Sequence, residues 1–311
     1  MRRIPAALAV IGLTALALVG CSANQPPTCD RVSSTGNVAD LVSVTGEAGT
    51  APDVEVSLPF RTESVEYADV TRGGGVTLID ENQGFALGFT IIDGTTGEQL
   101  IREGYDSLTA VTTIARWDNL IPGFRDALMC ATDGSRIVVG LSSGDFADGV
   151  AAQIGLAEGD SAVAVLDLRQ VYLSAADGAD QFNESRGLPT DVRAPDGRPG
   201  VLLPDAAPPA DTVVQVVKKG DGDVVAAGDT VGVNLMQVDW QNRTVTENSW
   251  GSGPARVIAT SGANALTDAL IGQTVGSQVL IVTPTDLVPP PAGTAPSGPQ
   301  VFVVDVLGIQ G

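Results

Sequence analysis

The sequence predicts an α+β protein made of two similar copies, in each of which one short helix lies across one face of an antiparallel sheet. The chain has 37 Gly and 19 Pro among its 311 residues and only 4% aromatic residues, which is typical of many short strands joined by turns. Hydrophobic residues make up 43% of the chain, which is enough for packed cores. An internal repeat is the third observation.

The repeat relates residues 123–139 to residues 265–281 at a constant offset of 142. Both segments contain Asp-Ala-Leu, then Gly-Ser, then an apolar run. In the first segment, apolar residues from Phe124 to Ala131 recur at helical spacing between Pro122 and Gly134, which predicts a short amphipathic helix. Duplication of a whole unit explains this match better than chance similarity of one helix.

The copies are expected over residues 51–175 and 213–311. Residues 176–212 contain six prolines with Gly and Asp throughout, and this composition predicts a linker. A second Pro-rich segment, residues 288–299, is expected to form an exposed loop within the second copy.

The N-terminus has the pattern of an export signal. Arg2 and Arg3 precede an apolar run over residues 4–19, shorter than the roughly 20 residues of a membrane-spanning helix. The run ends in Leu-Val-Gly-Cys at Cys21, which resembles the bacterial lipobox, whose cysteine is acylated and becomes the mature N-terminus. Residues 1–20 are therefore predicted to be a lipoprotein signal peptide, and the mature protein to be extracytoplasmic and anchored by lipid. An ordinary signal peptide with a chance cysteine is the alternative.

Residues 21–50 are small and polar and contain Pro and Gly, which predicts a flexible tether. With Cys21 committed to lipid, Cys29 and Cys130 are the remaining thiols. In an oxidising compartment they are expected to form a disulfide, and two unpaired thiols are the alternative.

The absence of histidine excludes Ser-His and Cys-His catalysis and histidine metal ligation. The net charge of −20 would repel nucleic acid, so nucleic acid is an unlikely partner.

Six motifs of the second copy follow one another in the order found in a known family: Gly228-Asp229-Thr230-Val231, Glu247-Asn248-Ser249-Trp250, Ala269-Leu270-Ile271-Gly272, Val275-Gly276-Ser277, Thr283-Pro284 and Val301–Leu307. Together they resemble the FKBP-type peptidyl-prolyl cis-trans isomerase domain. The first copy resembles the same family through Leu120-Ile121-Pro122-Gly123-Phe124, Ala127-Leu128 and Gly134-Ser135-Arg136. The resemblance implies two antiparallel half-barrels, each wrapping one short helix, joined by the Pro-rich linker.

In that family, aromatic side chains line a pocket for the proline ring, and no nucleophile, metal or cofactor takes part. The resemblance places Phe89, Tyr105, Asp106, Leu120, Ile121 and Phe124 around this pocket in the first copy. The corresponding positions of the second copy are Leu235, Glu247, Trp250, Gly262, Ala263, Leu266 and Phe302. A later family tyrosine corresponds to Phe146 or Val288.

Alternatives remain for several of these residues. Phe89, Ile121 and Phe124 could be ordinary core residues, Asp106 and Glu247 could be solvated turn acids, and Trp250 could be a pocket wall or a surface aromatic.

The resemblance implies a lipid-anchored peptidyl-prolyl isomerase that assists the folding of exported, proline-containing polypeptides, without a cofactor. The alternative is an FKBP-like binding or chaperone lipoprotein with weak or no catalysis. A solute-binding lipoprotein would need parallel sheets, and the βαβ alternation is missing. The first copy keeps the larger pocket residues, so activity is expected to be weak and to lie mainly within residues 51–175.

Overall fold

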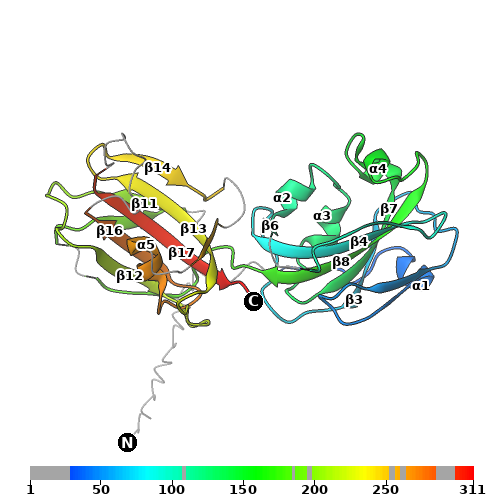
Figure 1. The fold of residues 1–311 in the computed structure, drawn as a ribbon, viewed down its shortest axis with the longest axis horizontal. Coiled ribbons are helices and arrows are strands. Elements are labelled where there is room, and N and C mark those ends of the chain that lie inside the picture. Colours follow the sequence, from blue (N-terminus) through cyan, green and yellow to red (C-terminus); the bar gives the residue numbers. More distant parts are fainter. Residues whose placement is uncertain are drawn as a thin grey trace, which may run out of the picture.

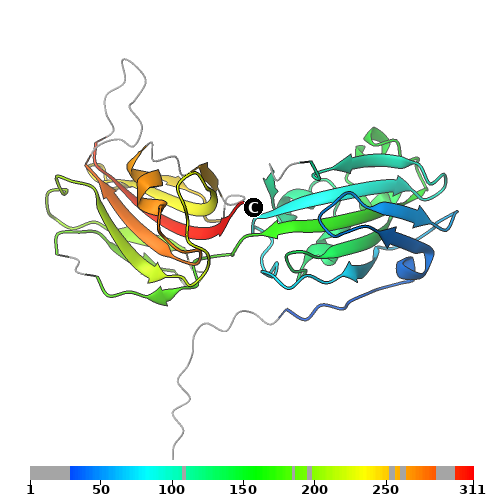
Figure 2. The ribbon, with the colours of Figure 1, turned by 60° about the horizontal axis from the view of Figure 1, so that its bottom comes forward.

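The computed structural model describes residues 29–106, 110–183, 186–194, 198–251, 256–259, 264–284 and 298–311. Figure 1 shows two β-rich parts that lie side by side along the long axis, with the C-terminus between them. Figure 2 shows the same parts from a second direction, joined by one extended segment. We call residues 29–171 the first unit and residues 176–311 the second unit.

The first unit is built on one antiparallel sheet. Its strands are β3 (Glu66–Thr71), β4 (Phe85–Asp93), β5 (Gln99–Glu103), β6 (Val111–Thr112), β7 (Arg136–Ser142) and β8 (Ser161–Val171). The strand order is β3-β7-β8-β4-β5, and β6 also pairs with β4. Every residue of β4 is buried, which fits an apolar run covered on both faces of the sheet.

The second unit is built on a similar antiparallel sheet. Its strands are β9 (Ala179–Asp180), β12 (Val213–Lys219), β13 (Thr230–Asp239), β14 (Thr244–Asn248), β15 (Arg256–Ala259), β16 (Gln278–Thr283) and β17 (Gln300–Ile309). The order is β14-β13-β17-β16-β12-β9, and β15 also pairs with β13. From β12 to β14 this order has the same connectivity as the order from β3 to β5 in the first unit.

Short helices cover one face of the first sheet, which we call its inner face. They are α2 (Ile114–Trp117), α3 (Phe124–Leu128) and α4 (Val150–Gln153), and the 3-10 turn η1 (Ser143–Asp145) follows β7. The predicted helix is confirmed as α3, whose Phe124, Ala127 and Leu128 are buried against the sheet. Gly134 has a φ of +80°, a conformation that glycine adopts without strain, and it turns the chain from α3 toward β7.

The opposite, outer face of the first sheet is covered by N-terminal residues. Helix α1 (Val38–Leu41) and the hairpin of β1 (Val42–Thr45) and β2 (Asp53–Val56) pack there on an apolar cluster. The buried Arg136 pairs with the buried Asp167 at 2.8 Å and also donates hydrogen bonds to backbone carbonyls of residues 46, 47 and 50. Residues 29–50 are therefore docked on the sheet, which differs from the flexible tether predicted for residues 21–50.

The predicted linker also differs from the structure. Besides β9, it contains the hairpin of β10 (Thr190–Arg193) and β11 (Pro199–Leu202). Val201 and Leu203 pack on the outer core of the second unit, a cluster that includes Trp240 and Trp250. On the inner face, α5 (Ala265–Leu270) packs on a separate core. Residues 176–212 therefore belong largely to the second unit, because their apolar side chains cover its outer face.

The two units share a hydrogen-bonded turn between helix and strand. In the first unit, Thr132 Oγ1 donates to the carbonyl of Gly73 at 2.8 Å, and the Gly73 N–H donates to Ser135 Oγ at 3.0 Å. In the second unit, the equivalent bonds of 2.6 and 3.0 Å are made by Thr274, Gly220 and Ser277. Thr274 and Ser277 stand at the repeat offset of 142 from their counterparts.

The units meet at the connecting residues 172–175. The buried Tyr172 ring lies against Gly232 and Gly308, which are directly opposite each other on β13 and β17. A Cβ atom at Gly232 would overlap the ring. The Leu173 N–H donates to the Leu307 carbonyl at 2.9 Å. Because the two glycines have no side chains, they leave room for the tyrosine ring, which packs against the second unit and so connects it to the first.

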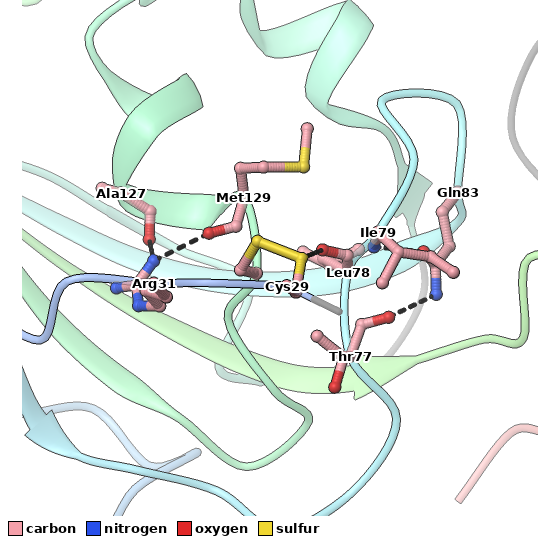
Figure 3. The surroundings of a disulfide bond; sticks show 9 residues. Cys29, Arg31, Thr77, Leu78, Ile79, Gln83, Ala127 and Met129 are labelled. Carbon is pink, nitrogen blue, oxygen red and sulfur yellow. Dashed lines mark hydrogen bonds between the residues drawn. A yellow bond between two sulfur atoms is a disulfide. The ribbon is translucent and has the colours of Figure 1, made fainter. Parts of the chain in front are cut away.

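The expected disulfide between Cys29 and Cys130 is present. Figure 3 shows it beside Arg31, whose Nη1 donates to the carbonyls of Ala127 and Met129 at the end of α3, at 2.6 and 3.0 Å. Arg31 also pairs with the buried carboxylate of Asp69 at 2.6 Å. The N-terminal segment is thus fixed to the C-terminal end of α3 by both a covalent bond and charged hydrogen bonds.

Candidate functional site

A pocket of about 640 Å³ lies on the inner face of the first unit. Leu87, Phe89 and Ile91 of β4 form its floor, because alternate residues of a strand point to the same face. The walls come from β5, β6, α2, residues 120–121 and α4. The volume lies within the usual range for small-molecule pockets, and the floor is entirely apolar.

Three aromatic rings contact one another in sequence from this floor into the core. The Phe89 and Trp117 ring centroids are 5.1 Å apart in an edge-to-face arrangement, and Trp117 and Phe124 are 5.3 Å apart. Phe89 and Trp117 line the pocket, whereas Phe124 is fully buried behind Trp117 in the core. The resemblance implied that Phe124 forms the floor of the pocket. In the structure Phe124 lies deeper in the core, and Trp117 lies between Phe124 and the pocket.

Charged groups are confined to the rim of the pocket. The pocket is lined by four exposed charged residues, Arg102, Glu103, Asp106 and Arg116. Leu120 is 40% exposed at the mouth, and Ile121 is buried beside the floor. Since no titratable side chain among the described lining residues belongs to the floor, the arrangement suits binding of an apolar ring rather than proton transfer.

Tyr105 does not join this pocket. Its ring packs against Gly88, which faces the outer side of the sheet because it alternates with the pocket residues of β4. Its hydroxyl donates to Asp167 Oδ2 at 2.9 Å. Burial, and then the neighbouring Asp167 carboxylate, raise the pKa of Tyr105 above its usual value. The placement of Tyr105 in the pocket was therefore wrong, and it belongs to the Arg136–Asp167 cluster.

The corresponding residues of the second unit form a filled core. Leu235, Leu266 and Phe302 pack together in the inner core, and Leu235 and Phe302 are each 1% exposed. Glu247 lies on β14 opposite Gln237 and is half-buried. Among the described residues of the second unit, these side chains leave no aromatic box comparable to that of the first unit.

Trp250 lies on the other side of the second sheet. It is 9% exposed and packs with Trp240 in the outer core, away from α5. The sheet therefore separates it from Leu266, and it is not a wall of a pocket beside α5. It lines a cleft between the units instead.

The sequence reasoning missed Trp117, Val150 and Ile154, which all line the pocket. The sequence contained two indications for Trp117. Tryptophan occurs only three times in the chain, and Thr113 is a typical N-cap residue for a short helix that would contain Trp117. In the structure Thr113 Oγ1 accepts from the N–H of Arg116 at 3.1 Å and so begins α2. Val150 and Ile154 carried no comparable signal, since α4 has only four residues.

Several predictions fall outside the described residues: the signal peptide, Cys21, Ser22 to Thr28 of the tether, Gly262, Ala263, Val288 and the loop up to residue 297. Within the described ranges, no group of three or more His, Cys, Asp or Glu side chains could hold a metal ion. The helices of the same ranges are all too short or too polar to span a bilayer.

No protein-family model matches the chain. An FK506-binding protein of Streptomyces anulatus is 26% identical over 120 residues, which are 36% of this chain and 97% of that protein. Among solved structures, the three FKBP domains of wheat FKBP73 cover 79% of this chain and 94% of that chain, with 11% identity and a TM-score of 0.33. FkpA from Escherichia coli covers 39% of this chain and 51% of that chain, with 23% identity and a TM-score of 0.28. The chain thus resembles FKBP-type isomerases.

Proposed function

We propose that this chain is an FKBP-type peptidyl-prolyl cis-trans isomerase and that it binds the prolyl residue in the pocket of the first unit. The observation that carries the proposal is the apolar pocket with Phe89 and Trp117 at its floor and charges only at its rim. A proline ring is apolar and flat enough to pack on aromatic faces. The similarity to the FK506-binding protein of Streptomyces anulatus supports the same assignment.

The mechanism requires no proton transfer. Rotation about an Xaa-Pro bond is slow because amide resonance creates a barrier of roughly 18–20 kcal/mol. The planar amide is more charge-separated than the twisted one, so an apolar pocket that excludes water favours the twisted amide. In this chain, Phe89 and Trp117 would hold the ring, Leu120 and Ile121 would exclude water, and Phe124 would support Trp117 from behind.

We further infer that the two units are copies of one FKBP-like half-barrel. The shared connectivity of the sheets and the matching Thr-Ser-Gly turns support this inference. Each sheet also carries a hairpin on its outer face above a buried polar pair, Arg136–Asp167 in the first unit and Gln278–Asp305 in the second. The repeated unit therefore includes the hairpins β1–β2 and β10–β11, and the linker between copies shortens to a few residues.

The copies are proposed to differ in activity. Phe302, Leu235 and Leu266 fill the inner core of the second unit, whereas the first unit keeps an open pocket. Catalysis is therefore assigned to the first unit.

The location belongs to the same proposal. The Leu-Val-Gly-Cys motif supports a lipid on Cys21 and, with it, exported polypeptides as clients. Cys21→Ser, expressed in a bacterial host, should move the protein from the detergent phase to the aqueous phase. Equal partitioning of variant and wild type would refute the anchor.

A binding module with little catalysis is the second candidate. It is favoured by the absence of a tyrosine hydroxyl at Phe89 and by the exposure of Glu103 and Asp106, the two acids among the described residues that line the pocket. Such a module would bind proline peptides in the same pocket without accelerating their isomerisation.

A matched pair of variants tests the assignment. Phe89→Leu and Phe302→Leu each remove one buried ring, from the pocket and from the second core respectively. In a protease-free assay on an Xaa-Pro peptide, Phe89→Leu should lower kcat/KM by roughly tenfold or more, and Phe302→Leu should leave it within about twofold. Circular dichroism checks that both variants fold. Equal losses would contradict the site, and binding without any acceleration by the wild type would favour the binding module.

A further inference from the structure

A groove of about 780 Å³ lies on the outer face of the second unit, and we call it the outer groove. Met236 and Val238 of β13 and Val201 of β11 form an apolar floor, which belongs to the outer core. One border is the hairpin β10–β11, and the other is the edge strand β14. In Figure 1, β14 forms the upper margin of the second unit, and β11 lies below it. None of the residues that line the groove lines the prolyl pocket.

Exposed apolar side chains are concentrated at this groove. Val192, Leu202 and Val245 line it, and all three are exposed. Ten large apolar side chains are exposed among the described residues, so three of them gather at one place. Single exposed apolar residues are common on protein surfaces, whereas a group of them above an apolar floor is typical of a binding surface.

The charged residues that line the groove all have the same sign. They are Arg193, Arg198 and Arg243, and the described lining contains no Asp, Glu or Lys. The whole chain has 37 acidic and 17 basic residues, so this lining is the reverse of the overall composition. Arg and Met are enriched at protein–protein interfaces, where Asp, Glu and Lys are depleted. The groove therefore has the composition of a protein interface and the charge that attracts carboxylates.

Two of these arginines stand at opposite ends of β11. Arg198 directly precedes the strand, and Arg243 donates to the carbonyl of Pro204, two residues beyond its end, at 3.1 Å. The Arg243 guanidinium also lies 3.6 Å from the carboxylate of Asp205, which is fully exposed. This distance is too long for a good hydrogen bond, so a carboxylate of a ligand can replace Asp205 at little cost. The third arginine, Arg193, is already held by Gln278 at 2.8 Å.

Both borders of the groove are edge strands. β14 pairs with β13 and β11 pairs with β10, and neither has a second partner among the described strands. β14 contains neither Pro nor Lys, the residues that commonly protect an exposed edge. A peptide strand added to β14 would place every second side chain on the outer face, beside Val245. An acyl chain could cover the same floor, but it would leave the edge unpaired. An extended polypeptide therefore fits the groove better than a lipid.

We propose that the outer groove binds an extended segment of another protein, with an apolar residue at its centre and an acidic residue at each end. Residues i and i+4 of an extended chain lie on one face, about 13 Å apart, which is also the length of the four-residue strand β11 between the two arginines. The expected pattern is therefore acid, any residue, apolar residue, any residue, acid. This inference goes beyond the isomerase and does not depend on it, because no residue of the prolyl pocket takes part.

A peptide without proline tests the groove separately from the prolyl pocket. The probe is Glu-Thr-Leu-Thr-Glu with blocked termini, and the control peptide Lys-Thr-Leu-Thr-Lys has the same apolar centre. The readout is the methyl resonance of Met236 in the full chain, which contains only three methionines. We expect this resonance to shift saturably with the glutamate peptide and not with the lysine peptide. No shift with the glutamate peptide, or equal shifts with both, would overturn the proposal.

Matched variants test the contacts. Arg243→Gln removes a guanidinium that bonds one carbonyl and faces one aspartate, and Arg61→Gln removes one with the same kinds of partner in the first unit. Val245→Asp adds a carboxylate to the groove, and Val224→Asp adds one outside it, at valines that are 56% and 61% exposed. Arg243→Gln should raise the Kd of the glutamate peptide about 2- to 5-fold, and Val245→Asp roughly tenfold or more. Both controls should match the wild type.

Other occupants of the groove would give different results. A Met236 shift with vesicles of anionic phospholipid, and none with the peptide, would replace the peptide by a membrane. A Met236 shift that grows with protein concentration alone would identify a second copy of this chain. Either result would overturn the proposal, as would equal losses of affinity in Val245→Asp and Val224→Asp. None of these outcomes bears on the isomerase, because the probe contains no proline.

Discussion

Two equivalent positions of the sheets carry different buried polar pairs. Arg136 pairs with Asp167 in the first unit, whereas Gln278 Nε2 donates to Asp305 Oδ1 at 2.6 Å in the second. Asp305 is 1% exposed, and its burial raises the pKa of its carboxyl above the usual value. The Ala176 N–H, Gln278, Arg193 and Lys218 oppose this shift without cancelling it. The glutamine thus makes a hydrogen bond where the first unit has a full counter-charge.

This difference predicts a pH dependence of stability. Because the pKa of Asp305 is higher in the folded than in the unfolded chain, its stabilising contribution is complete below the unfolded value and is lost as pH rises through the folded value. We expect the unfolding free energy of the wild type, minus that of Asp305→Asn, to fall as pH rises above about 4, the ordinary pKa of an aspartate. Denaturant titrations at several pH values measure it. A difference that grows with pH would contradict the burial argument.

Of the residues expected around a prolyl pocket, Phe89, Asp106, Leu120 and Ile121 line the pocket of the first unit, whereas Tyr105 and Trp250 do not. Both of these residues lie two positions beyond the end of a strand, Tyr105 after β5 and Trp250 after β14. The face of the sheet on which such a side chain packs depends on how the chain leaves the strand, and the alternation of residues within a strand does not determine this.

The N-terminal segment is the element whose role differs most from expectation. It is held to the end of α3 by the disulfide and by Arg31, as Figure 3 shows. The disulfide links residues 101 positions apart. Closing a loop of that length removes much of the entropy of the unfolded chain, by up to about 4.7 kcal/mol in the chain-entropy model.

Cys29→Ser/Cys130→Ser should therefore lower the unfolding free energy by about 2–4 kcal/mol, measured by denaturant titration under oxidising conditions. The wild type in reductant serves as the control and should lose a similar amount. Unchanged stability of the double variant would show that Arg31 and the hairpin hold the segment without the covalent bond.

Helix α3 was predictable from its apolar spacing and its following glycine, whereas the hairpins β1–β2 and β10–β11 were not. Their sequences are rich in polar residues, Gly and Pro, which is also the composition of linkers. An isolated hairpin is at best marginally stable, and these two exist because a sheet face lies beneath them. Their folding is a tertiary effect that local composition does not reveal.

The two units are joined by Tyr172, which packs on two facing glycines. Gly232→Val would place side-chain atoms where the ring lies, and should separate the units at this point. Gly74→Val is the matched control, because no atom lies within 4 Å of its Cβ position. Hydrogen exchange of the Leu173 amide, which bonds Leu307, should accelerate about tenfold or more in Gly232→Val only. Equal protection in both variants would mean that the ring does not hold the joint.

In the proposed function, the prolyl residue binds beside Trp117. The three tryptophans report on three places: Trp117 lines the pocket, Trp240 lies in the outer core of the second unit, and Trp250 lines the cleft. Their indole N–H resonances can be followed separately while a proline tetrapeptide is added to the full chain, with each resonance assigned by a Trp→Phe variant. We expect the chemical shift of the Trp117 indole N–H to change saturably with peptide concentration, while the chemical shifts of the Trp240 and Trp250 indole N–H groups do not change. Saturable binding that leaves Trp117 unmoved would contradict the assignment.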